Sequence, residues 1–80
     1  MPRGKLRVLN LNATVKEYDV RTLFSSFGIV YRVFLARDNS GTCMGYAFVL
    51  MRDAGEASKA VNALNGIQFF DHSIHVEEYA

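Results

Sequence analysis

The sequence predicts an α+β fold in which two helices cover one face of a four-stranded antiparallel sheet. Strand-like segments begin near positions 5, 29, 44 and 73, and two segments with helical spacing of apolar residues lie among them, in the order β-α-β-β-α-β. The chain has 80 residues, of which 50% are hydrophobic, and this is enough for one compact core. We therefore interpret residues 1–80 as a single domain.

The first strand is predicted at residues 5–11, where charged and apolar residues alternate before an apolar, β-compatible run. Thr14 and Glu17 have the spacing of a capping box, so they indicate the start of a helix. Gly28 is expected to end this helix. The apolar positions between these ends recur at helical spacing and are Val20, Leu23, Phe24 and Phe27.

Two further strands are predicted at residues 29–36 and 44–51. The first is β-branched and aromatic, and the second is an apolar run with two central aromatic residues. The residues between them include Asp38, Asn39, Ser40 and Gly41, which are typical of a turn. We expect the two strands to pair as an antiparallel hairpin.

The second helix is predicted at residues 53–65, with Asp53 as its N-cap and Gly66 at its end. Its narrow apolar stripe consists of Ala57, Ala60, Val61 and Leu64. The closing strand, residues 73–77, alternates with period two, so Ile74 and Val76 point to one face and Ser73, His75 and Glu77 to the other. Short right-handed connections make the ferredoxin-like sandwich the favoured arrangement, and it leaves one sheet face without helices.

Composition narrows the classes of function. Nine Lys and Arg residues against eight Asp and Glu residues give a net charge of +1, so binding to nucleic acid must rely on local contacts. Cys43 is the single cysteine, which favours a reducing intracellular location, with the cytoplasm expected and the nucleus as the alternative. No apolar run approaches the ~20 residues that span a bilayer and no leader opens the chain, so we expect no membrane partner.

Residues 44–51, Met-Gly-Tyr-Ala-Phe-Val-Leu-Met, resemble the octamer of the RNA-recognition-motif family, with its glycine, both central aromatic residues, the small residue and the valine in place. Residues 6–11, Leu-Arg-Val-Leu-Asn-Leu, resemble the paired hexamer of that family. Both motifs fall on the strands where the family has them. The resemblance implies a non-enzymatic RNA-binding domain.

Alternation along the third strand predicts which residues meet RNA. Met44, Tyr46, Phe48 and Leu50 share one face, and the opposite set packs on the helices. The alternative, in which Tyr46 and Phe48 are core residues, would bury a set of mixed polarity. Exposed rings can stack unpaired bases at ~1–3 kcal/mol per base, so single-stranded RNA is the expected ligand. The predicted RNA-binding residues are Arg7, Leu9, Arg32, Phe34, Tyr46, Phe48, Leu50 and His75.

Several positions depart from the family pattern or leave alternatives open. Arg7 replaces the usual aromatic residue of the hexamer, although a guanidinium can stack on a base or bind phosphate. Met44 removes the octamer's opening cation, and Met51 replaces its closing aromatic residue on the core side. A side chain at Gly45 is expected to crowd the sheet or the helix layer. Tyr79 either covers the sheet or extends into solvent.

In a narrower resemblance, the chain is similar to the C-terminal RNA recognition motif of the g subunits of eukaryotic translation initiation factor 3. It is carried by the first-strand pattern Leu-Arg-Val-x-Asn-Leu and by residues 32–38 and 70–77. Those subunits also tend to have arginine in the hexamer. The resemblance implies a role in translation initiation, with mRNA or rRNA and other initiation factor subunits as partners, and it implies that the chain is a fragment of a longer protein.

Enzymatic and metal chemistry are not expected. His72 and His75 are three residues apart on a strand, so they point to opposite faces, and no C-x-x-C motif supports a metal site. Cys43 is interpreted as a small apolar core residue. We expect no catalytic residue, no metal and no cofactor. The alternative function is a protein-interaction domain on the same fold, with little or no RNA binding.

Overall fold

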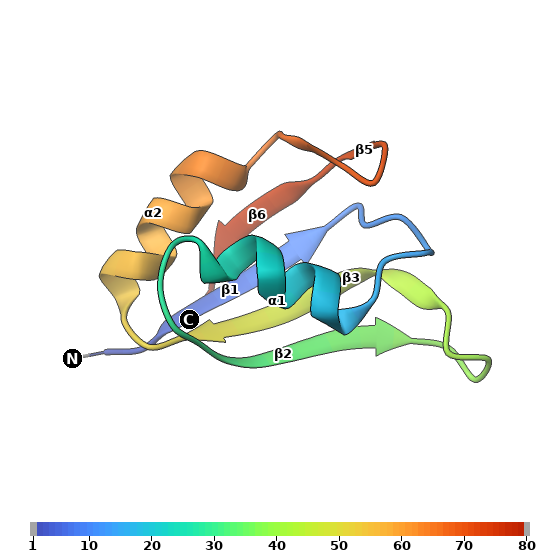
Figure 1. Ribbon diagram of the computed structural model, residues 1–80, viewed down its shortest axis with the longest axis horizontal. Coiled ribbons are helices and arrows are strands. Elements are labelled where there is room, and N and C mark those ends of the chain that lie inside the picture. The colour runs from blue at the N-terminus through green and yellow to red at the C-terminus, as the bar shows by residue number, and fades with distance from the viewer. Residues whose placement is uncertain (1, 80) are drawn as a thin grey trace.

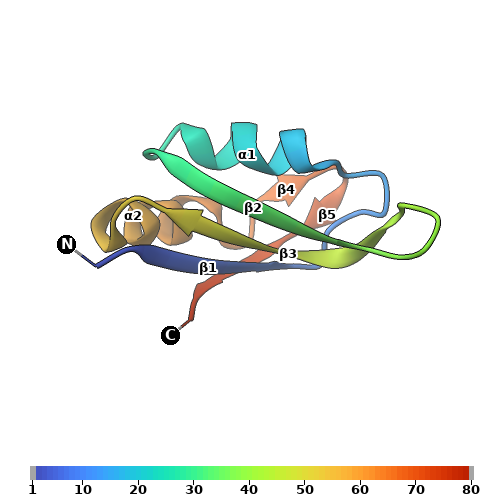
Figure 2. The same ribbon diagram turned by 90° about the horizontal axis from the view of Figure 1, so that it is seen from below.

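The computed structural model describes residues 2–79, and these form one sheet with two helices on one side (Figures 1 and 2). The main strands are β1 (Gly4–Leu9), β2 (Val30–Arg37), β3 (Cys43–Met51) and β6 (His75–Glu78). They pair in the order β2-β3-β1-β6, and every pairing is antiparallel. The predicted ferredoxin-like sandwich is confirmed.

Two helices form the second layer of the fold. Helix α1 (Glu17–Ser25) packs over β2, and helix α2 (Ala54–Leu64) packs over β1 and β6. The core between the layers receives Val20 and Phe24 from α1. The predicted stripe of α2 is also confirmed, because Ala57, Ala60 and Leu64 are buried and Val61 packs against the core cluster. Within residues 2–79, the opposite face of the sheet carries no helix, and we call it the open face.

The start of α1 differs from the predicted capping box. Thr14 belongs to the preceding loop, where its backbone N–H and its hydroxyl both donate to Oδ1 of Asn12 at 2.9 Å. The helix is capped instead at Lys16, whose backbone N–H donates to Oδ2 of Asp19 at 2.9 Å. The helix also ends before Gly28, since its last residue is Ser25. The N–H of Phe27 then bonds the carbonyl of Phe24 at 3.0 Å in a tight turn.

Helix α2 begins as the sequence predicted. The Asp53 carboxylate accepts a hydrogen bond from the backbone N–H of Glu56 at 2.9 Å, and Asp53 itself has extended backbone angles. This satisfies one of the N–H groups that every helix leaves unpaired at its start.

A small hairpin between α2 and β6 was not predicted. It consists of β4 (Gln68–Phe69) and β5 (His72–Ser73), joined by Phe70 and Asp71, which both have positive φ angles of 51° and 64°. Ser73 therefore belongs to this hairpin, and the last strand of the sheet begins at His75. The hairpin escaped prediction because turns of this kind usually contain Gly or Asn at the positive φ positions.

Candidate nucleic-acid interface

The alternation predicted for β3 is present in the structure. Ala47, Val49 and Met51 are buried under the helices, with at most 1% of each residue exposed. Met44 is exposed on the open face, and the next residues of the same face are partly exposed, namely Tyr46, Phe48 and Leu50. Tyr46 and Phe48 are thus not core residues, and their rings belong to the open face.

Strand register places the other candidate residues beside these rings. Arg7 and Phe34 are the two cross-strand partners of Phe48, and Glu77 is the partner of Arg7. One row across the sheet is therefore Phe34, Phe48, Arg7 and Glu77. The neighbouring rows are Tyr46, Leu9 and His75 on one side and Arg32, Leu50 and Lys5 on the other. All eight candidate residues therefore share the open face.

The rings of the open face form a connected group, which we call the aromatic cluster. Phe48 is its centre, with ring centroids 6.2 Å from Phe34, 5.9 Å from Tyr46 and 5.4 Å from Tyr79. Phe34 is the most exposed of these residues, at 61%. The cluster therefore presents apolar ring surface on which an unpaired base can stack.

Tyr79 covers part of this surface. Its ring meets Phe48 in a T-shaped contact, and its backbone N–H donates to the carbonyl of Lys5 at 3.0 Å. The sequence left open whether Tyr79 covers the sheet or extends into solvent. The structure shows that it covers the sheet.

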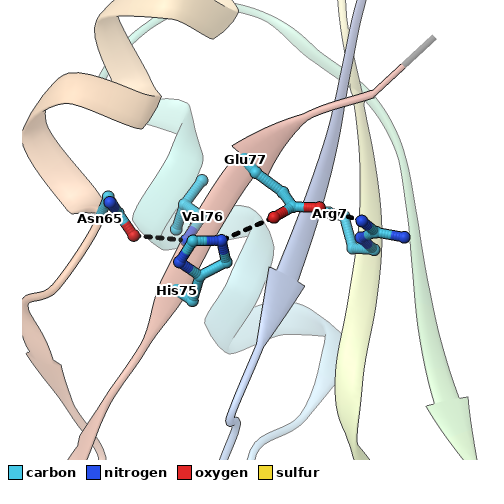
Figure 3. Close-up of polar contacts among 5 residues, drawn as sticks. All are labelled: Arg7, Asn65, His75, Val76 and Glu77. Atoms are coloured by element: carbon cyan, nitrogen blue, oxygen red, sulfur yellow. Dashed lines mark hydrogen bonds and ion pairs between the residues drawn. The ribbon is translucent and has the colours of Figure 1, made fainter.

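Glu77 links two candidate residues at the end of the row (Figure 3). Its carboxylate accepts a hydrogen bond from Nη2 of Arg7, and its other oxygen lies 2.6 Å from Nε2 of His75. The bond from Arg7, followed by the contact with His75, lowers the pKa of Glu77 below its ordinary value. The carboxylate therefore stays ionised at neutral pH, and the Arg7 guanidinium is already paired.

Arg7, which replaces the aromatic residue of the hexamer, is thus held by its ion pair with Glu77. Side-chain exposure is 42% for Arg7, 31% for Glu77 and 50% for His75, so solvent and ligands reach all of them. Within residues 2–79, Nε of Arg7 is buried and has no hydrogen-bond partner. On the other side of β6, the backbone N–H of Val76 donates to Oδ1 of Asn65 at 3.0 Å and anchors this strand to the end of α2 (Figure 3).

Two cationic side chains lie in the row of Leu50, at one end of the open face. Lys5 and Arg32 are exposed on either side of Leu50. The Arg3 guanidinium lies over the ring of Tyr31, with 5.3 Å between its central carbon and the ring centroid. The face therefore has a basic end, and the row next to it carries the pair of Arg7 and Glu77 at the β6 edge of the sheet.

The glycine of the octamer has a different role from the one predicted. A Cβ atom added to Gly45 would meet only the carbonyl oxygen of Leu11, at 3.6 Å, which is an ordinary contact. The prediction of crowding is therefore wrong. Glycine is required because φ is +98° at this position, where side chains of L-residues are disfavoured.

Sequence reasoning left Glu77 out of the site and left the position of Tyr79 open. Alternation did place Glu77 on the face of His75, but nothing local in the sequence pairs it with Arg7, 70 positions away.

Among the described residues there is no group of three or more His, Cys, Asp or Glu side chains arranged to hold a metal ion. Neither helix between residues 2 and 79 has the length and apolar character needed to cross a membrane.

The RNA recognition motif family model matches residues 6–75, which include both strand motifs and all eight candidate residues of the open face. The chain belongs to the RNA recognition motif family. A crystal structure of the RNA binding protein PG1 superposes on this RNA recognition motif with a TM-score of 0.90 at 30% identity, and the match covers 95% of this chain and 93% of that chain.

Two other similarities bear on function. A chain in a solved complex of the Sex-lethal protein with RNA matches with a TM-score of 0.88 at 28% identity, over 94% of this chain and 47% of that chain. The g subunit of eukaryotic translation initiation factor 3 from Phaeosphaeria nodorum is 41% identical over 73 residues, which cover 90% of this chain and 26% of the relative. The chain therefore spans about a quarter of the length of such curated relatives.

Proposed function

We propose that this RNA recognition motif binds single-stranded RNA through its open face, as one domain of the g subunit of a translation initiation factor 3. The aromatic cluster centred on Phe48 is the observation that carries the proposal. Its rings lie on the face that the helices leave uncovered, and they are spaced for stacking on unpaired bases. Bases of a duplex are already stacked on each other, so single strands are favoured.

The surroundings of the cluster support the same ligand. Lys5 and Arg32 lie at the basic end of the open face, where they can contact phosphates. His75 and Leu9 extend the surface beside Tyr46. Similarity to a protein solved in complex with RNA supports RNA as the partner, and similarity to the initiation factor relatives supports mRNA or rRNA, other initiation factor subunits and a cytoplasmic location. The proposed activity is binding without turnover.

A second candidate function is a protein-interaction domain on the same face. Two observations favour it, since Tyr79 already covers Phe48 and Glu77 already pairs with Arg7, so both groups must be released or shared before RNA binds. Phe34 is 61% exposed and would then serve as an apolar contact for another factor. Direct RNA titration separates the two functions.

The test compares two ring deletions in a residue-resolved NMR titration with short RNAs of mixed sequence. Phe48→Ala should weaken RNA affinity by ~1–3 kcal/mol, because a stacking surface is lost. It should lower the free energy of unfolding by less than the ~3–5 kcal/mol of a fully buried ring, because Phe48 is only partly buried. Amide shifts on RNA addition should concentrate on β1 and β3.

Tyr18→Ala is the matched control, because this ring is 74% exposed on α1, away from the open face. It should leave RNA affinity unchanged. If folded Phe48→Ala binds RNA as tightly as the unchanged chain, the open face is not the RNA site, and the protein-interaction function takes its place.

A further inference from the structure

The row of the open face that contains Arg7 ends at β6 in an acidic side chain, which is unfavourable on a surface that binds phosphates. Glu77 lies in the same row as Phe48 and Arg7, next to the aromatic cluster, and its side chain is 31% exposed. An ionised carboxylate repels the phosphates of RNA. A nucleotide that meets this end of the row must therefore present its base and not its backbone.

The carboxylate still has acceptor capacity. An ionised carboxylate offers about four lone-pair sites and no donor. Arg7 and His75 each approach one of the two oxygens of Glu77, so further lone pairs are free to accept hydrogen bonds. Contacts on both sides also fix the position of the carboxylate, so little side-chain freedom is lost when a base binds.

The order of polar groups along the row distinguishes the bases. Arg7 supplies N–H donors, and beside it Glu77 supplies two acceptor oxygens. Guanine presents the complementary order on one edge, with the acceptor O6 next to the donors N1–H and N2–H₂. Adenine and cytosine each present one amino donor beside an acceptor nitrogen, and uracil presents one N–H between two carbonyl oxygens. Only guanine offers two adjacent donors to a carboxylate.

We propose that Arg7 and Glu77 together select guanine at a base position on the aromatic cluster. In this arrangement N1–H and N2–H₂ of guanine donate to the carboxylate of Glu77, and an N–H of the Arg7 guanidinium donates to O6. His75 is a positioning residue that holds the second oxygen of Glu77. The inference rests on the proposed function, since it specifies which base the RNA-binding face prefers.

The test uses five RNA pentamers of uridines whose central position is guanosine, adenosine, cytidine, inosine or uridine. Their affinities are measured by fluorescence anisotropy with the unchanged chain. The guanosine pentamer should bind about tenfold more tightly than the adenosine, cytidine and uridine pentamers, as expected for a good bidentate contact. Inosine lacks the N2 amino group, so its pentamer should lie between guanosine and the others.

Two neighbouring charge deletions complete the test. Glu77→Gln replaces one acceptor oxygen by a donor, so the preference for guanosine should fall below about threefold. Glu78→Gln removes the same charge from the next residue of β6, which is exposed and points to the opposite face of the sheet. It should keep the full preference, and amide spectra of both variants report whether the fold is retained.

The outcomes separate this inference from the proposed function. If no pentamer binds the unchanged chain, RNA binding by the open face is itself wrong. If all pentamers bind equally, RNA binding stands and guanine selection is wrong. A uniform gain in affinity for every pentamer with Glu77→Gln would mean that Glu77 only competes with RNA for Arg7, and this also overturns guanine selection.

Discussion

Single residues on the open face owe their roles to partners far away in the chain. Arg7 replaces an aromatic residue of the family, and its charge is neutralised by Glu77 across the β1–β6 pairing. Ion pairs at such exposure contribute little to stability, because water screens them. The role that we propose for this pair is therefore in base recognition, for which the two side chains present donors and acceptors in a fixed order.

Gly45 is a residue of β3 whose backbone angle restricts substitution. Gly45→Ala should lower the free energy of unfolding by ~1–3 kcal/mol, because a non-glycine residue is strained at φ +98° although space for a Cβ is available. Urea denaturation followed by circular dichroism measures this change. A loss below about 0.5 kcal/mol would show that β3 relaxes at this position without cost.

At the scale of elements, each helix begins with a carboxylate that accepts a backbone N–H, but the sequence revealed only one of these contacts. Asp53 caps α2 in the predicted way. At α1 the Thr14 and Glu17 spacing is misleading, because Thr14 bonds Asn12 and the helix is capped at Lys16 through Asp19. Several side chains near a helix start have suitable spacing, and only the path of the loop decides which is used.

A pair of substitutions in the first turn of α1 tests this assignment. Asp19→Ala should lower the free energy of unfolding by about 1 kcal/mol, because the N–H of Lys16 loses its acceptor. Glu17→Ala removes the same charge from the same turn and should lower the free energy of unfolding by less. The Glu17 carboxylate is expected to stabilise the helix only through its favourable interaction with the helix dipole. Thermal and urea denaturation of both variants gives the comparison. An equal or larger loss of stability with Glu17→Ala would contradict this assignment and favour the predicted capping box of Thr14 and Glu17.

The molecule as a whole carries a net charge of +1, and three of its nine Lys and Arg side chains make ion pairs or hydrogen bonds within the fold. Arg7 pairs with Glu77, Arg52 pairs with Glu56, and Arg21 donates to the carbonyl of Val30. Lys5 and Arg32 remain exposed on the open face. Affinity for RNA should therefore depend more on stacking and base contacts than on long-range attraction.

The salt dependence of RNA binding checks this charge distribution. The slope of log affinity against log salt should be about −1 to −3, because few phosphates are neutralised. Arg32→Gln should reduce the magnitude of the slope by about 0.7, the contribution of one phosphate on a single strand. Lys59→Gln, on the exposed side of α2, is the matched control and should leave the slope unchanged. A slope near −8 would contradict the charge distribution.

The order of the two helices and the four main strands, the open face of β3 and the buried side of each helix could be predicted from the sequence, because alternation and helical spacing are local patterns. These patterns placed the rings of Phe48 and Tyr46 on the open face. The tertiary structure alone decided the register that joins Arg7 to Glu77, the position of Tyr79 over Phe48 and the positive φ of Gly45. Each of these depends on how segments distant in the chain pair or on a backbone angle set by that pairing, and no short stretch of sequence contains this information.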